Sequence, residues 1–176
     1  MKFRTIAYLL LVVSTSGVAA LRSLAGDLPA TSDSVQMKIE AREVGPRELE
    51  DLTKNAIERD YSAAWAALAQ ALDQNNPDLL NAHFTGFAKD NFAQRIADQR
   101  RAGSHTRYRD LGHRASIIFY SPDGLGIQLL DDVQFEIQLF DGETLVSSTK
   151  VNRHYIALLT PAETSWKIRI LQDVPH

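Results

Sequence analysis

Residues 127–159 read IQLLDDVQFEIQLFDGETLVSSTKVNRHYIALL, and their pattern determines the class of fold that we expect. Apolar and polar residues alternate over most of this stretch, which is typical of strands with one buried face. The pair Asp141-Gly142 in its middle is a strong signal for a tight hairpin turn. The stretch therefore predicts two long antiparallel strands joined by a hairpin.

The register of this hairpin decides which polar side chains face the core. If the Asp-Gly pair is the whole turn, odd-numbered residues of the first strand oppose even-numbered residues of the second. Asp131 then opposes Asn152, and His154 lies beside them on an otherwise apolar face. A three-residue turn would instead point Arg153 and Tyr155 inward. Asp131, Asn152 and His154 are candidate site residues, and ordinary hydrogen bonding near strand ends is the competing explanation.

The rest of the chain predicts helices followed by further strands. Pro46 opens a long amphipathic helix that runs to about residue 73. Two short helices follow up to Gly103, and Asp90 can cap the second of them. The residues after Gly103 have the pattern of β-strands. Apolar and polar residues also alternate over residues 35–41, which form a candidate edge strand. We expect an α+β fold, with a long N-terminal helix and two short helices packed on a curved antiparallel sheet of about four long strands. An extra N-terminal edge strand is a further candidate element.

The first 20 residues have the layout of a secretory signal: cations, an apolar run, and small residues before Leu21. An uncleaved N-terminal anchor is the alternative, although the apolar run is far short of the ~20 residues that span a bilayer. We expect a signal peptide over residues 1–20, a flexible leader over 21–33 and a single domain over 34–176. The expected location is periplasmic or secreted, or outside the cytoplasm on a membrane anchor.

Composition and charge exclude several classes of function. The chain has 176 residues, no cysteine and a formal net charge of −3. Residues 1–20 hold two cations and no acids, so the charge without them is −5. This charge predicts no nucleic-acid partner, and a membrane contact only if the N-terminal segment stays attached. No metal-ligand spacing and no Gly-rich phosphate loop occurs, so we expect neither a metal nor a cofactor.

Six arginines between residues 95 and 114 form a basic stretch with few nearby acids. They could form a surface for anionic partners. The expectation that we favour is internal neutralisation by acids such as Asp98 and Asp110, because the chain has more acids than bases.

The order of elements resembles the nuclear-transport-factor-2-like superfamily, a cone-shaped α+β fold. The resemblance covers residues 46–174 and is carried by the helix break Asn75-Asn76-Pro77-Asp78-Leu79-Leu80 and the terminal strand Trp166-Lys167-Ile168-Arg169-Ile170-Leu171. It implies a cavity between helices and sheet, which some members use for isomerase or dehydratase chemistry and others for ligand or protein contact. Members that resemble steroid isomerases place an Asp base near a Tyr or acidic donor. The alternating strand at 35–41 departs from the usual pattern.

Two functions follow from these observations. The first is an exported, non-enzymatic binding or assembly module for a small apolar ligand or a protein partner. Apolar residues on the outer face of the two-residue hairpin would suit a homodimer: Phe140, Val151, Tyr155, Ala157 and Leu159.

The alternative is a small isomerase or lyase that acts on a carbonyl compound. Asp131 would be its base, His154 a partner or second acid/base, and Tyr61 or Tyr120 the oxyanion donor. This function requires those side chains to converge in a pocket, for which the candidate lining residues are Trp65, Phe84 and Phe87.

Overall fold

The computed structural model describes residues 37–41 and 44–174 of the chain. The predicted signal peptide and leader lie outside the described residues. In chain order the elements are β1 (Met37–Ala41), α1 (Asp51–Asp73), the 3-10 helix η1 (Pro77–Leu80), α2 (Gly86–Ala102), β2 (Ser104–Tyr120), β3 (Ile127–Asp141), β4 (Thr144–Pro161) and β5 (Trp166–Asp173).

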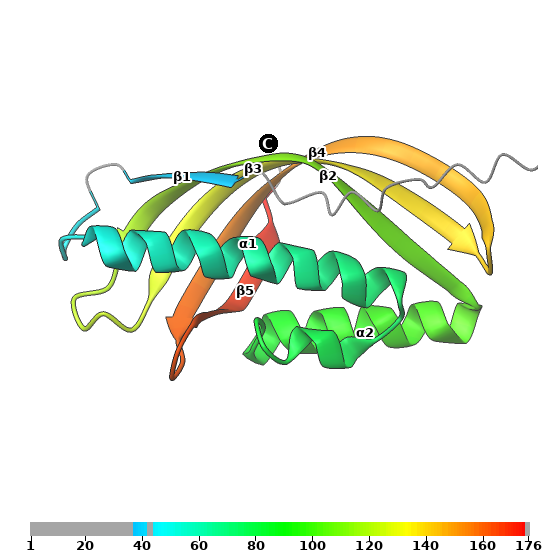
Figure 1. Ribbon diagram of the computed structural model, residues 1–176, viewed down its shortest axis with the longest axis horizontal. Helices are drawn as coiled ribbons and strands as arrows, with labels where there is room; N and C mark the ends of the chain where they lie inside the picture. Colours follow the sequence, from blue (N-terminus) through cyan, green and yellow to red (C-terminus); the bar gives the residue numbers. More distant parts are fainter. Residues whose placement is uncertain (1–36, 42–43, 175–176) are drawn as a thin grey trace, which may run out of the picture. The chain divides into compact units, whose positions relative to one another are not determined.

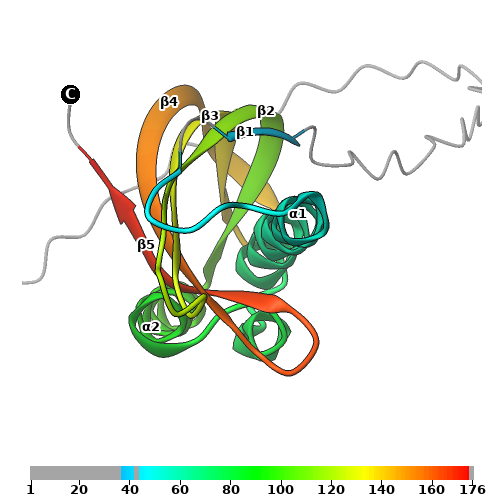
Figure 2. The ribbon, with the colours of Figure 1, turned by 90° about the vertical axis from the view of Figure 1, so that its left-hand side faces the viewer.

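The five strands form one sheet in the order β1-β2-β3-β4-β5. Each neighbouring pair is antiparallel except β1 and β2, which are parallel. The sheet is curved and unclosed, and it arches over α1 and α2, which lie on its concave side (Figures 1 and 2). The expected α+β class is confirmed, and so is the added N-terminal edge strand.

The core fills the space between the concave face of the sheet and the helices. Apolar residues of α1 recur at steps of three and four, so they form one face of the helix, and that face is buried. Those buried apolar residues are Ile57, Tyr61, Ala64, Trp65, Leu68, Ala71 and Leu72. From the sheet, the odd-numbered residues of β3 complete this core: Ile127, Leu129, Val133 and Phe135 are all buried.

Two of the predicted helix starts were wrong, because tertiary pairing overrides the local signals. Pro46 forms an isolated bridge with Tyr120, and α1 begins only at Asp51. The third predicted helix begins before its expected cap at Asp90. Phe84 bridges to Ile168 of β5, and the 17-residue α2 follows directly from Gly86. Gly103 ends α2 with a φ of 69°, the left-handed conformation that glycine adopts at low cost.

The two-residue register predicted for the β3–β4 hairpin was wrong. Asp141 pairs with Thr144, so the turn residues are Gly142 and Glu143. A β-bulge then inserts Val146, because Leu139 pairs with Ser147 while Phe140 pairs with Leu145. One extra residue reverses the faces of the strand beyond it. From residue 147 onward, odd-numbered residues of β4 therefore oppose odd-numbered residues of β3.

This reversal moves the side chains that the sequence placed on each face. Val151, Tyr155, Ala157 and Leu159 belong to the core face, so they do not form the outer apolar patch invoked for a homodimer. A bulge also changes which side chains of β5 face the core. Ile168 is buried as expected, but a second bulge after it turns Leu171 inward in place of Ile170.

Candidate functional site

The carboxylate of Asp131 is fully buried in the core face of β3. Its Oδ2 accepts a hydrogen bond from the Tyr61 hydroxyl of α1 at 2.9 Å. The same oxygen lies 2.8 Å from Nδ1 of His113 on β2, and this ring nitrogen donates when the carboxylate is ionised. The carboxylate thus joins one helix and two strands. Its second oxygen, Oδ1, has no hydrogen-bond partner in the described part of the chain.

Aromatic rings and a second carboxylate enclose this cluster. The His113 side chain is only 2% exposed, and its Nε2 lies 3.6 Å from Oδ1 of Asp110. The indole of Trp65 packs on the His113 ring with centroids 4.9 Å apart. Burial, followed by the negative charge of Asp131, raises the pKa of Tyr61 well above its usual value. The Tyr61 hydroxyl therefore keeps its proton and remains a donor.

The structure separates the two residues proposed as an acid/base pair. His154 lies on the outer face of the sheet, where Nδ1 contacts the carboxylate of Asp132 rather than Asp131. Asn152 is exposed on that same face. Together with Asp132 they line a hollow of about 440 Å³ on the convex side. The physical reason is the bulge at Val146, which reverses the faces of β4.

The other predicted residues divide between the core, the surface and a cavity. Tyr61 reaches Asp131 as expected of a donor, whereas Tyr120 packs against Trp166. Phe84 is buried in the core, and Phe87 is 66% exposed. Neither phenylalanine therefore lines a pocket at Asp131. Trp65, however, lines the cavity described next.

An aromatic cavity of about 290 Å³ lies between the helices and the sheet. Its walls carry aromatic and aliphatic side chains from α1 and α2 and from strands β2 to β5. The apolar and aromatic lining residues are Trp65, Leu68, Phe92, Tyr108, Phe135, Ile137, Tyr155 and Leu171. Asp131, Tyr61 and His113 are not part of this lining. Trp65 contacts both His113 and Tyr155, so its indole separates the buried carboxylate cluster from the cavity.

Polar groups in the cavity wall come from α2, β4 and β5. Arg95 is exposed, its guanidinium lies 5.6 Å from the centre of the Tyr108 ring, and it has no ion pair within the described residues. Arg153, by contrast, pairs with Asp173 at 3.1 Å. Burial raises the pKa of Tyr155 to about 12, with further contributions from Tyr108 and Asp173. The Tyr155 hydroxyl therefore stays protonated at neutral pH and can donate a hydrogen bond.

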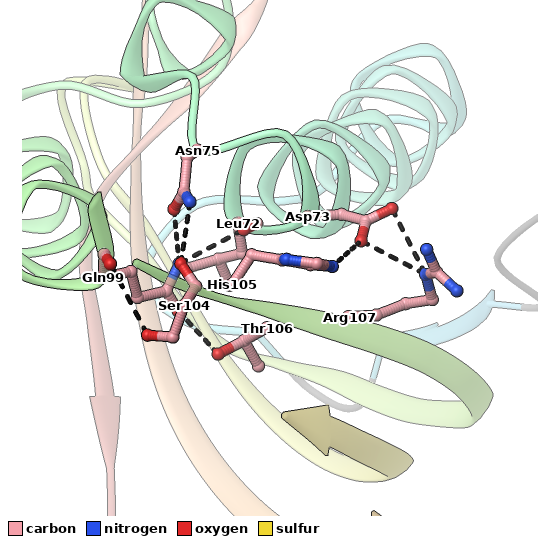
Figure 3. A network of polar contacts seen from close by, with 8 residues as sticks. All are labelled: Leu72, Asp73, Asn75, Gln99, Ser104, His105, Thr106 and Arg107. Atoms are coloured by element: carbon pink, nitrogen blue, oxygen red, sulfur yellow. Dashed lines mark hydrogen bonds and ion pairs between the residues drawn. The ribbon is translucent and has the colours of Figure 1, made fainter. Parts of the chain in front are cut away.

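A separate polar network ties the end of α1 to α2 and the start of β2 (Figure 3). The Gln99 amide donates to the Leu72 carbonyl and the Asn75 side chain and accepts from Thr106. At its edge, Asp73 contacts His105 and pairs with Arg107 at 3.2 Å. Each of these contacts connects one element of the fold to another, so we interpret the network as a structural connection.

The basic stretch is neutralised in part by this and other ion pairs. Arg101 pairs with Asp98, as expected from the sequence, and Arg109 lies 3.7 Å from Glu136. Across residues 37–41 and 44–174, no group of three or more His, Asp or Glu residues could hold a metal ion. Within the same residues, no helix has the length and apolar character needed to cross a membrane.

Comparison with known proteins supports a fold and no activity. No protein-family model and no curated protein matches the sequence. Among solved structures, the intermembrane space region of the chloroplast protein ARC6 matches with a TM-score of 0.62 and 16% identity, over 74% of this chain and all of that one.

Two further solved structures match with lower scores. A putative scytalone dehydratase from Novosphingobium aromaticivorans has a TM-score of 0.47 at 15% identity, over 70% of this chain and 85% of its own. A protein of unknown function with a cystatin-like fold, from Nostoc punctiforme, has a TM-score of 0.42 at 14% identity, over 72% of this chain and 93% of its own. The similarity to the ARC6 region shows a shared fold, and none of these similarities shows a shared activity.

Sequence reasoning missed His113 and the aromatic cavity. The sequence does not single out His113 as a partner of Asp131, because nothing near it indicates a contact with a residue 18 positions away. Between Asp110 and Gly112 the β2–β3 register shifts by one residue, and beyond this bulge His113 is on the core face opposite Val133. The weak signal available was Gly112 inside a strand pattern, since such a glycine often marks a bulge.

Replacing Asp131 with alanine tests whether the buried cluster holds the fold together. We expect D131A to lower the free energy of unfolding by about 3–5 kcal/mol, because it leaves His113 and the Tyr61 hydroxyl buried without their acceptor. Urea denaturation measures this change. The control is D132A, which removes a half-exposed carboxylate one residue away and should cost about 0–1 kcal/mol. Equal effects of the two variants would contradict the assigned role.

Alkaline unfolding tests the environment of Tyr155. An ordinary tyrosine loses its proton near 10.0, whereas Tyr155 in the folded chain retains its proton up to about 12. The unfolded chain therefore binds fewer protons in this window, so stability falls as the pH rises from 10.0 to about 12. The variant Y155F should show a shallower fall in urea-unfolding free energy over the same window. Identical slopes for the two proteins would show that Tyr155 is not buried as described.

Proposed function

We propose that this domain is a binding module, and that its aromatic cavity takes an elongated apolar or aromatic group that carries an anionic end. The observation that carries the proposal is the position of Arg95. Its guanidinium lies over Tyr108 in the cavity wall and has no carboxylate partner within the described residues. An anionic group of a ligand would provide that partner.

The rest of the cavity wall fits the same ligand. Rings of Trp65, Phe135 and Tyr155 offer faces and edges for an aromatic or aliphatic body. The Tyr155 hydroxyl can donate a hydrogen bond because its proton is retained at neutral pH. Ligand sites in proteins commonly have this composition, with a mostly apolar wall and a few polar groups that fix orientation.

Burial of Asp131 favours binding over the isomerase or lyase alternative. A general base must come within hydrogen-bond distance of the proton that it removes. Asp131 has no exposed surface, and its Oδ2 is already shared by Tyr61 and His113. Its expected partner His154 lies on the other side of the sheet. An enzyme with Asp131 as base would need the wall around Trp65 to open.

We further propose that the chain belongs to the nuclear-transport-factor-2-like superfamily and that the domain works outside the cytoplasm. The order of long helix, helix break and curved antiparallel sheet supports the first proposal. The signal-like composition of residues 1–20 supports the second. The intermembrane-space origin of the ARC6 region is compatible with a domain outside the cytoplasm.

Fluorescence titration with anilinonaphthalene sulfonate tests the cavity, because this probe joins two aromatic ring systems to an anion. We expect the wild-type domain to bind it, and R95Q to bind it about tenfold more weakly, a loss of about 1.4 kcal/mol. The neutral probe phenylnaphthylamine should bind both proteins equally. The matched control is R100Q, an exposed arginine of the same helix that does not line the cavity.

A cavity-filling variant separates binding in the cavity from binding elsewhere. I137W adds an indole within the wall and should abolish binding of both probes, whereas L145W adds one at an exposed hairpin position and should leave binding unchanged. Circular dichroism verifies that both variants are folded. Unaltered probe binding in folded I137W would contradict the proposed site.

A further inference from the structure

Strand β5 covers only part of the edge of β4. β5 pairs with residues 155–161 of β4, but β4 begins at Thr144. Over residues 144–153, the described part of the chain supplies only one neighbouring strand, β3. Among the described residues, no strand lies beside the other edge of β4 over this length, and Figure 1 shows β4 extending past β5 there.

The direction of the backbone groups on this edge follows from one hydrogen bond. The Val174 amide donates to the His154 carbonyl at 2.8 Å, so the backbone of residue 154 points toward β5. Backbone direction alternates along a strand, so the N–H and C=O groups of Ser148, Lys150 and Asn152 point the same way. Beyond the end of β5 these groups face away from β3. They offer a ladder to an extended segment of about five to seven residues.

The aromatic cavity lies on the concave side of this same edge. Arg153 and Tyr155 of β4 and Asp173 at the end of β5 are part of its wall. Side chains of an added strand would alternate between the two faces of the sheet. Every second one would share the face of Val151 and Arg153, and so would point toward the helices and the cavity.

We infer that residues 148–152 of β4 bind an extended protein segment by strand addition, and that one aromatic side chain of this segment enters the cavity. The inference rests on the proposed function, because it uses the same cavity. The segment carries acidic residues two positions from its aromatic residue, since residues i and i+2 share a face. Those acids would meet Arg95, which lines the cavity and has no ion pair within the described residues.

Charge also argues against a second copy of the chain as the occupant. Antiparallel pairing of residues 148–152 with the same residues of another copy sets Lys150 opposite Lys150. Like charges directly opposite on paired strands are destabilising. A lysine at an open edge also disfavours uncontrolled strand pairing. The edge is thus protected from self-association while it remains open to an acidic segment.

The test uses the peptide TDVWVDT-amide, labelled with fluorescein at its N-terminal amine, and the purified protein, with fluorescence anisotropy as the readout. In this peptide the tryptophan and both acids share one face. We expect N152P to weaken binding at least tenfold, because proline removes an edge N–H and adds bulk there. N152A, which loses the same side chain but keeps the N–H, should bind like wild type. Hydrogen exchange should also show protection of the Lys150 and Asn152 amides when peptide is bound.

The outcomes separate this inference from the proposed function. Loss of peptide binding in N152P with anilinonaphthalene sulfonate binding retained supports strand addition. Equal peptide binding by N152P and N152A would overturn strand addition. Equal binding of the original peptide and of the same peptide N-methylated at alternate residues would also overturn it. Either result would leave the cavity proposal unaffected. Binding of the sulfonate probe without any peptide binding would likewise overturn strand addition alone. If neither the probe nor the peptide binds, strand addition and the cavity proposal are both overturned. Concentration-dependent dimers that N152P abolishes would also overturn it, since the edge would then serve a second copy.

Discussion

The carboxylate of Asp131 is the buried charge around which the rest of the domain is arranged. It lies at 0% exposure on β3 and is held by Tyr61 of α1 and His113 of β2. Burying a carboxylate is unfavourable unless hydrogen bonds replace those it made with water. These contacts therefore constrain the position of α1 on the sheet. Trp65, one helical turn from Tyr61, then covers the cluster and becomes a wall of the aromatic cavity.

Two bulges position the proposed binding surface and the buried cluster beside it. The extra residue at Val146 turns Arg153 and Tyr155 toward the helices, and the irregularity between Asp110 and Gly112 turns His113 toward Asp131. The first bulge builds the cavity wall, and the second builds the buried cluster. Because β5 stops at Asp173, the cavity lies beside an edge of β4 that has no neighbouring strand in the described chain. Cavity and open edge are therefore consequences of the same strand geometry.

Much of the architecture could be predicted from periodicity, and the site only in part. Alternation in residues 127–140 predicted the core face of β3 correctly, including Asp131, and Tyr61 on the stripe of α1 was a correct donor candidate. The predicted partners of Asp131 on β4 were wrong, because the bulge reverses the faces of the strand beyond it. The residue type at Val146 gives no signal for a bulge. Helix starts at Pro46 and Asp90 failed because bridges to Tyr120 and β5 outweigh local capping signals.

We propose that the buried carboxylate cluster is a structural connection and that the aromatic cavity beside it is the binding site. A crystal structure of the domain with anilinonaphthalene sulfonate distinguishes these two roles. We expect the probe rings to lie among Trp65, Tyr108 and Tyr155, the sulfonate beside Arg95, and Asp131 still hydrogen-bonded to Tyr61 and His113. A probe in contact with Asp131, with Trp65 displaced from the cluster, would overturn this assignment.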